Sequence, residues 1–194
     1  MRSSRIHVTG ASGSGVTTLG RFVAHALAIP HHDTDDYFWQ PTHPPFRTKR
    51  PAEDRIRLME DVFLPRTQWV LTGSLDGWGD VIAHCYFDLV VYVSTPTDIR
   101  LQRLREREAR RFGDDAFGVG GWREEDLANF LAWAAQYDNP EDGFTGRSRS
   151  RHDAWLKALP CPVLRVPGTD CIDDITARVV AAVLKLSGNT PRHP

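Results

Sequence analysis

The chain has 194 residues, of which 41% are hydrophobic, and this is enough for the core of one domain. Its formal net charge of −1 argues against a general attraction to nucleic acid or to an anionic membrane. Three cysteines, an odd number without C-x-x-C spacing, favour reduced thiols and a cytoplasmic protein. No apolar run is long enough to span a bilayer, so we expect no membrane partner.

A glycine-rich stretch at residues 10–18 follows the first apolar run and opens the first helical pattern, residues 16–27. Gly10, Gly15 and Thr17 fit the phosphate-binding pattern G-x-x-x-x-G-K-[ST], but Val16 stands where the pattern has lysine. Backbone N–H groups and the positive end of a helix bind phosphate without a lysine, although a turn with no ligand is the alternative. The residues expected to bind a nucleotide are Gly10, Ser12, Gly13, Ser14, Gly15, Val16, Thr17 and Thr18.

Strand-like apolar runs alternate with helical patterns along the rest of the chain. The runs lie at residues 6–9, 29–32, 69–72, 87–93 and 163–166, and the later helical patterns at 52–63, 97–108, 124–137, 153–159 and 173–186. Near-continuous apolar strands are typical of a parallel sheet covered by helices on both faces, so the pattern predicts a doubly wound α/β domain. Ligands of such sheets bind at the carboxyl ends of the strands.

Three carboxylates follow the second strand, in Asp33-Thr34-Asp35-Asp36. We expect Asp33 to hold Mg²⁺ together with Thr17, and Asp35 to accept a proton from a substrate hydroxyl. The alternative is a helix N-cap formed by Asp33 or Asp35. Thr72 ends the third strand where many P-loop proteins have a magnesium-binding aspartate, which places more weight on Asp33.

Candidate acceptor contacts come from two loops. The proline-rich segment 41–51 carries Arg47 and Arg50, which suit an anionic acceptor, although a solvated basic loop explains them equally well. Trp39 can stack on a planar substrate or pack in the core. Gly73 and Ser74 follow the third strand, where a glycine lets the backbone approach a ligand closely.

An arginine stripe marks the helical pattern that begins at residue 97. Arg100, Arg103, Arg107 and Arg111 share one face, and a salt-bridged solvated surface is the alternative. We expect Arg103, Arg107 and Arg111 to supply the charge for phosphoryl transfer that the loop lacks.

A lid-like insertion is expected at about residues 110–150 of a single domain at residues 1–186. Residues 112–121 hold four glycines and read as a flexible flap. A second arginine group at residues 147, 149 and 151 could close over the phosphates or face solvent. Residues 187–194 read as a disordered tail.

These motifs resemble the small P-loop kinases, a group that includes adenylate kinase, shikimate kinase and gluconate kinase. The segment Asp33-x-Asp35-x-x-x-Trp39 is similar to one in bacterial adenylate-kinase-like and topology-modulation-like proteins. The resemblance implies a P-loop NTPase fold, with a five-stranded parallel sheet in the order 2-3-1-4-5, helices on both faces and a lid. It also implies that Arg103 and Arg107 are lid-helix arginines and that Asp35 faces the acceptor.

Two functions fit these observations. The first is a kinase that uses ATP or another NTP, with Mg²⁺, to phosphorylate a small molecule such as a nucleoside monophosphate or a hydroxylated metabolite. The second is a nucleotide-binding switch with little turnover. An enzyme is favoured because the aspartate pair, the arginine stripe and the lid together suit catalysis. A nucleic-acid end kinase is disfavoured by the near-neutral net charge.

Overall fold

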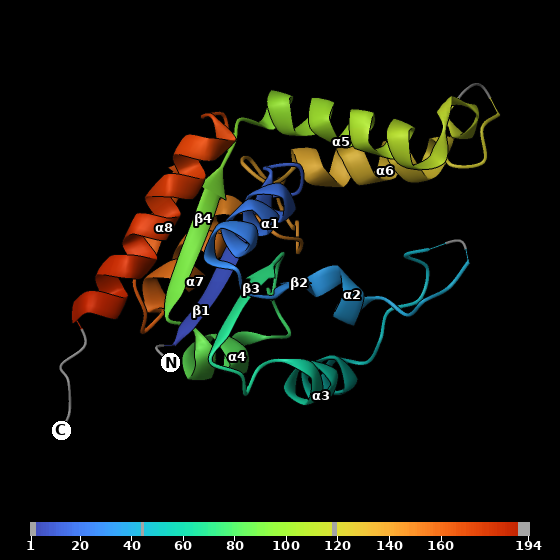
Figure 1. Cartoon of the computed structure of the whole chain (residues 1–194). Coiled ribbons are helices and arrows are strands. Elements are labelled where there is room, and N and C mark those ends of the chain that lie inside the picture. The colour runs from blue at the N-terminus through green and yellow to red at the C-terminus, as the bar shows by residue number, and fades with distance from the viewer. Residues whose placement is uncertain (1–2, 44, 118–119, 190–194) are drawn as a thin grey trace.

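The computed structural model describes residues 3–43, 45–117 and 120–189, which form a parallel sheet flanked by helices (Figure 1). The sheet order is β2-β3-β1-β4-β5, and every neighbouring pair is parallel. The strands are β1 (Ser4–Gly10), β2 (His31–Asp33), β3 (Gln68–Thr72), β4 (Leu89–Ser94) and β5 (Val163–Pro167). The predicted fold class and strand order are therefore confirmed.

Helices cover both faces of the sheet; one of them, α4, was not expected from the sequence, and another, α2, was expected only as the alternative in which Asp33 or Asp35 caps a helix. The helices are α1 (Val16–Leu27), α2 (Thr34–Phe38), α3 (Ala52–Val62), α4 (Asp80–Tyr86), α5 (Thr97–Phe112), α6 (Glu124–Ala135), α7 (Arg149–Ala158) and α8 (Ile172–Asn189), with a 3₁₀ turn η1 (Asp114–Ala116). Helices α2 and α4 have only five and seven residues, too few to display a helical period. Within the described residues, no helix is long and apolar enough to cross a membrane.

The position of strand β4 between two hydrophobic cores explains why its sequence is largely apolar. Leu89, Val91 and Val93 point toward one core, which also contains apolar residues of α1 and α8. Val90 and Tyr92 point toward the second core, which contains residues of α3, α4 and α7. Both faces of the strand are thus buried, and the alternation of a β-strand supplies side chains to two cores at once.

Helices α5 and α6 pack side by side and project beyond the carboxyl end of the sheet (Figure 1). At the base of this hairpin the Arg100 side chain is fully buried and ion-paired with Asp138 at 3.2 Å. Nearer the tip, the buried Glu108 is paired with Arg107 at 2.9 Å and with Arg123 at 3.7 Å. The second helix of the hairpin, α6, falls within the expected insertion, whereas most of α5 precedes it, and ion pairs hold the hairpin at both ends.

Two helix boundaries, the start of α7 and the end of α8, differ from those expected from the sequence. Helix α7 begins at Arg149, earlier than predicted, because the Ser148 hydroxyl accepts a hydrogen bond from the Arg151 N–H at 3.3 Å and caps the helix. Helix α8 is helical to Asn189, so it includes the start of the expected tail. Residues 190–194 of that tail lie outside the described part of the chain.

Candidate active site

The loop between β1 and α1 has the backbone of a phosphate-binding nest. Gly13 and Gly15 have φ of 82° and 97°, a region that side chains other than glycine rarely adopt. No side chain caps the N-terminus of α1, so its first N–H groups remain available to an anion. The Ser14 hydroxyl is buried and has no hydrogen-bond partner among the described residues. These features fit a bound phosphate group.

Val16 contributes only its backbone to this loop. Its side chain is buried in the core formed with Ile6, Val23 and other apolar residues of β1, α1 and α8. Residues 6–20 contain no lysine or arginine. Any positive charge at the phosphates, beyond the N–H groups, must therefore come from another segment.

Asp33 connects the loop to the end of β2. Its Oδ2 accepts hydrogen bonds from the hydroxyls of Thr17 at 2.9 Å and Thr72 at 3.1 Å. Its Oδ1 accepts a bond from the Asp35 N–H at 3.1 Å and so caps α2. The two interpretations of Asp33, cap and ligand, are therefore compatible, because they use different oxygens.

A hydroxyl and a carboxylate in contact are suitable ligands for Mg²⁺, which keeps several waters and binds one or two protein oxygens beside substrate phosphates. Thr17 and Asp33 fit such an ion. No cluster of three or more His, Cys, Asp or Glu side chains that could hold a metal occurs among the described residues. The predicted magnesium site thus depends on the Thr17–Asp33 contact and the phosphates themselves.

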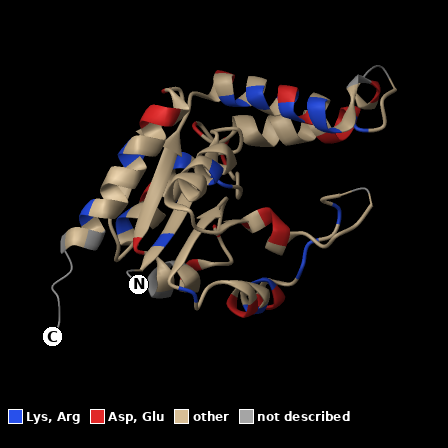
Figure 2. Ribbon diagram, in the orientation of Figure 1, with Lys and Arg blue, Asp and Glu red and all other residues tan. Residues whose placement is uncertain are grey.

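The Asp35 side chain is exposed to solvent, but charges on distant segments of the chain shift its pKa. Its pKa is raised, chiefly by desolvation from the surrounding protein and then by the charge of Asp33. Arg147 and Arg107 act in the opposite direction. Arg107 lies on α5, which carries both basic and acidic residues, and Asp35 lies on the acidic helix α2 (Figure 2). The effect of Arg107 on the pKa of Asp35 shows that the two charges are within electrostatic reach of one another.

The structure separates the arginines of the predicted stripe. Arg100 is buried at the base, and Arg103 donates from both Nη atoms to the carbonyl of Gly168 at 3.1 Å. Arg107 is paired with Glu108. The Arg111 guanidinium lies 4.6 Å from the ring centre of Phe46, and about 12 Å along the helix from Arg103 at 1.5 Å per residue. Arg111 therefore lies at the outer end of the hairpin.

Arg147 contacts the phosphate-binding loop directly and was not among the predicted site residues. Its Nη2 donates to the Ser12 hydroxyl at 3.3 Å, and its guanidinium lies 5.1 Å from the ring centre of Trp133. Desolvation lowers the pKa of Arg147, while Asp35 and Asp76 oppose that shift. The only sequence signal for this residue was the Arg-x-Arg-x-Arg run at residues 147–151.

The basic residues predicted to receive an acceptor are engaged within the protein. Arg47 forms a 2.6 Å ion pair with Asp126 of α6, and Arg50 donates to the carbonyl of Tyr37. Trp39 is half-buried and packs edge-on against Phe46. These contacts make the loop between α2 and α3 reach across to the hairpin.

Two predicted residues follow β3 as expected. Gly73 has a φ of 112°, and a side chain there would meet the Thr34 hydroxyl at 1.9 Å, so this glycine lets β3 approach α2. The Ser74 hydroxyl accepts a hydrogen bond from the Asp76 N–H at 3.2 Å. Ser74 also lines a small cavity together with Thr9 and His152.

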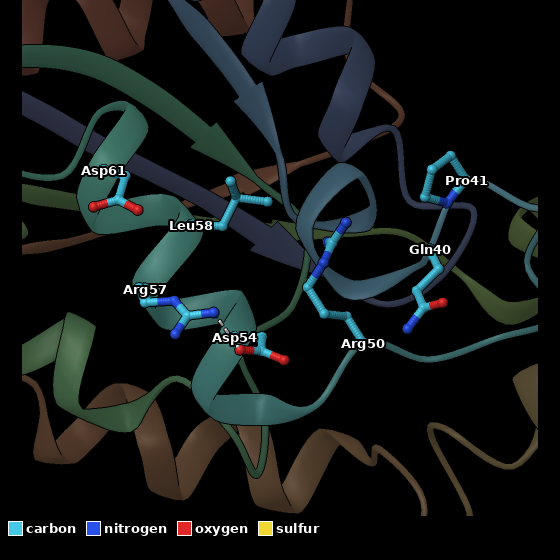
Figure 3. Close-up of a pocket in the computed structure, with 7 residues that line it drawn as sticks. All are labelled: Gln40, Pro41, Arg50, Asp54, Arg57, Leu58 and Asp61. Atoms are coloured by element: carbon cyan, nitrogen blue, oxygen red, sulfur yellow. Dashed lines mark hydrogen bonds and ion pairs between the residues drawn. The ribbon is translucent and has the colours of Figure 1, made fainter.

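An open pocket of about 500 Å³ lies beside α3 and away from the phosphate-binding loop (Figure 3). Its lining residues are Gln40, Pro41, Arg50, Asp54, Arg57, Leu58 and Asp61. Asp54 and Arg57 within it form a 2.8 Å ion pair. Because this lining includes neither the loop nor Asp33 and Asp35, we assign the pocket no role in nucleotide binding.

Comparisons with known proteins agree with this geometry, although no family model matches the chain. The chain is 41% identical over 175 residues to the uncharacterized protein YqaC of Bacillus subtilis (strain 168), covering 90% of this chain and 94% of YqaC. It is 30% identical over 118 residues to a cytidylate kinase of Haloarcula marismortui, covering 55% of this chain and 60% of that enzyme.

Solved structures share the fold at low sequence identity. A shikimate kinase from Acinetobacter baumannii in complex with shikimate aligns over 94% of each chain, with a TM-score of 0.55 and 16% identity. A gluconokinase from Sinorhizobium meliloti 1021 aligns over 97% of each chain, with a TM-score of 0.52 and 17% identity.

Proposed function

We propose that this chain, which belongs to the same family as YqaC and shares its fold with a shikimate kinase and a gluconokinase, transfers the γ-phosphoryl group of ATP to a small molecule in the presence of Mg²⁺. The observation that carries the proposal is the 2.9 Å contact between Thr17 and Asp33, with Asp35 two residues further on. This contact joins the proposed phosphate nest to Asp33, which lies two residues before the proposed acceptor-binding residue Asp35.

Each residue has a distinct part in the proposed reaction. The nest at residues 10–18 holds the phosphates, and Thr17 and Asp33 hold Mg²⁺, which neutralises phosphate charge when bound. Asp35 orients the acceptor hydroxyl and takes its proton as the acceptor oxygen bonds to the γ-phosphorus and the bond to the ADP oxygen breaks. The raised pKa of Asp35 makes this carboxylate a better base.

The arginines and the loop beyond α2 complete the proposed site. Arg103 and Arg107 supply positive charge along α5. Arg111 acts at the outer end of the hairpin, where it contacts Phe46 of the loop between α2 and α3. The proposed binding site for the acceptor is formed by Trp39, Arg47, Arg50, Gly73 and Ser74. A nucleoside monophosphate and a hydroxylated metabolite are the two acceptor classes that these groups suit.

A second candidate function is a nucleotide-binding protein with little or no turnover. The observation that favours it is Val16, whose side chain is buried and gives the phosphates no charge. Transfer of a phosphoryl group depends on positioned positive charge, whereas binding of the nucleotide can depend on N–H groups alone.

Calorimetry with ATP and Mg²⁺, followed by ADP release across a panel of acceptors, separates the two functions. The panel contains nucleoside monophosphates, small sugars and hydroxy acids. Binding together with acceptor-stimulated ADP release that is lost in Asp35→Asn supports the kinase. Binding without stimulated release on any acceptor supports the second function, and an absence of ATP binding overturns both.

A further inference from the structure

We propose that Arg147 supplies the positive charge at the β- and γ-phosphates that a lysine at position 16 would supply. The inference rests on the proposed nucleotide site and assigns the charge to a residue far from the loop in sequence. Arg147 reaches the loop through the Ser12 hydroxyl, at a sequence separation of 135 residues.

The other arginines near the loop are already engaged. Arg100 donates from Nε to the Thr95 carbonyl, from Nη1 to two further carbonyls, and from Nη2 to Thr97 and Asp138. Arg103 holds the Gly168 carbonyl with both Nη atoms. These two guanidiniums position the loop and the segment after β5, and they would have to break those bonds to reach a phosphate.

Arg147 has a different set of contacts. Within the described part of the chain it has no carboxylate within ion-pair distance, whereas Arg149 is paired with Asp138 at 2.6 Å and Arg151 with Asp76 at 2.8 Å. Its single described hydrogen bond goes to a neutral hydroxyl of the loop itself. A guanidinium with free N–H groups beside a phosphate nest suits the recognition of phosphate oxygens.

The surroundings hold Arg147 at this place. The next residue, Ser148, is buried and caps α7, and the Arg149 N–H donates to the Tyr137 carbonyl at 2.8 Å. The guanidinium lies over Trp133 of α6 at 5.1 Å. The position of Arg147 thus depends on the seating of α6 and α7, so the loop receives its charge from the hairpin side of the molecule.

A double-mutant cycle of Arg147→Ala and Val16→Lys tests this assignment, with ATP–Mg²⁺ affinity measured by calorimetry. Arg147→Ala should weaken binding by about 10- to 100-fold, the value of a charge-assisted hydrogen bond. Val16→Lys should restore most of that loss in the double variant and add much less when Arg147 is present. Arg66→Ala is the matched control, because Arg66 is exposed and, among the described residues, its side chain donates to the Val62 carbonyl alone. The ATP affinity of this variant should equal that of the wild type.

Other outcomes separate the inference from the proposed function. Unchanged ATP affinity in Arg147→Ala, or an equal gain from Val16→Lys with and without Arg147, overturns the inference alone. A wild-type chain that does not bind ATP overturns both. Because a lysine at the buried position 16 can disturb the fold, Arg147→Gln is measured as well, with its melting temperature. A folded Arg147→Gln variant that binds ATP like the wild type overturns the assignment, and a tenfold or greater loss supports it.

Discussion

Thr17 donates a 2.9 Å hydrogen bond to Oδ2 of Asp33, and this bond joins the first turn of α1 to the end of β2. Asp33 is the last residue of β2, and Thr17 lies on the helix that follows β1, a strand separated from β2 in the sheet by β3. Thr72 at the end of β3 completes the link with its own bond to the same oxygen. The ends of β2 and β3 and the first turn of α1 therefore bring one carboxylate and two hydroxyls together.

Replacement of Asp33 by Asn should uncouple nucleotide binding from magnesium. The amide keeps the shape but loses the negative charge that a hard cation prefers. We expect the gain in ATP affinity on adding Mg²⁺ to fall by at least about tenfold, which corresponds to the loss of one charged contact of about 1.4 kcal/mol. Calorimetry with and without Mg²⁺ measures this gain. Asp36→Asn, on the exposed side of α2, is the control, and an unchanged magnesium dependence in Asp33→Asn would contradict the assignment.

Replacement of Asp35 by Asn should reduce turnover by about 10²- to 10⁴-fold and leave ATP affinity nearly unchanged, because the carboxylate acts on the acceptor proton. The same variant should be at least as stable as the wild type at pH 7. The pKa of Asp35 is raised, so its ionised form is disfavoured in the folded state. Relative to the variant, the wild type should lose stability as the pH rises from about 4 through the raised pKa.

Melting curves of both proteins at pH 4 and pH 7 test this sign. If the wild type gains stability over Asp35→Asn as the pH rises, the fold stabilises the charged form instead, and the role of Asp35 as a tuned base loses its support.

Replacement of Arg100 by Ala should lower the free energy of unfolding by about 3–5 kcal/mol, because it removes one of the two arginine partners of Asp138 and leaves several carbonyls without a donor. Arg100→Lys should recover only part of this loss, since an ammonium group cannot make the same planar set of bonds. Urea denaturation measures both values. Arg110→Ala on the exposed side of α5 should change the free energy by less than about 0.5 kcal/mol, and an equal effect of the two alanine variants would refute the proposed support of the loop.

The protein should become less stable as the pH falls from about 6.5 toward 4. Burial lowers the pKa of His7 to about 3 and the pKa of His152 to about 4. A histidine whose pKa is lowered in the folded state binds a proton more readily in the unfolded chain. Each of the two histidines therefore adds up to about 1.4 kcal/mol per pH unit to the dependence of the free energy of unfolding on pH across this range. Urea denaturation between pH 7 and pH 4.5 measures the slope. His7→Gln should reduce it, and His25→Gln on the exposed face of α1 should not.

The sheet was predictable because local patterns encode its strands. Apolar runs such as residues 87–93 indicate strands buried on both faces, and the resemblance of the motifs to the small P-loop kinases implied the observed strand order. The glycine-rich loop between β1 and α1 was recognisable because its backbone conformation favours glycine at fixed positions, and Gly13 and Gly15 have positive φ.

The sequence by itself determined which residues carry charge and on which face of a helix they lie, since a helical period is a local property. Only the tertiary structure decided what each charge meets. Arg100 and Arg103 share a face, yet one is buried against Asp138 and the other holds Gly168. Arg147 reaches Ser12 because the segment between α6 and α7 lies next to the loop, and a contact across 135 residues depends on the packing of the whole domain and on no local pattern.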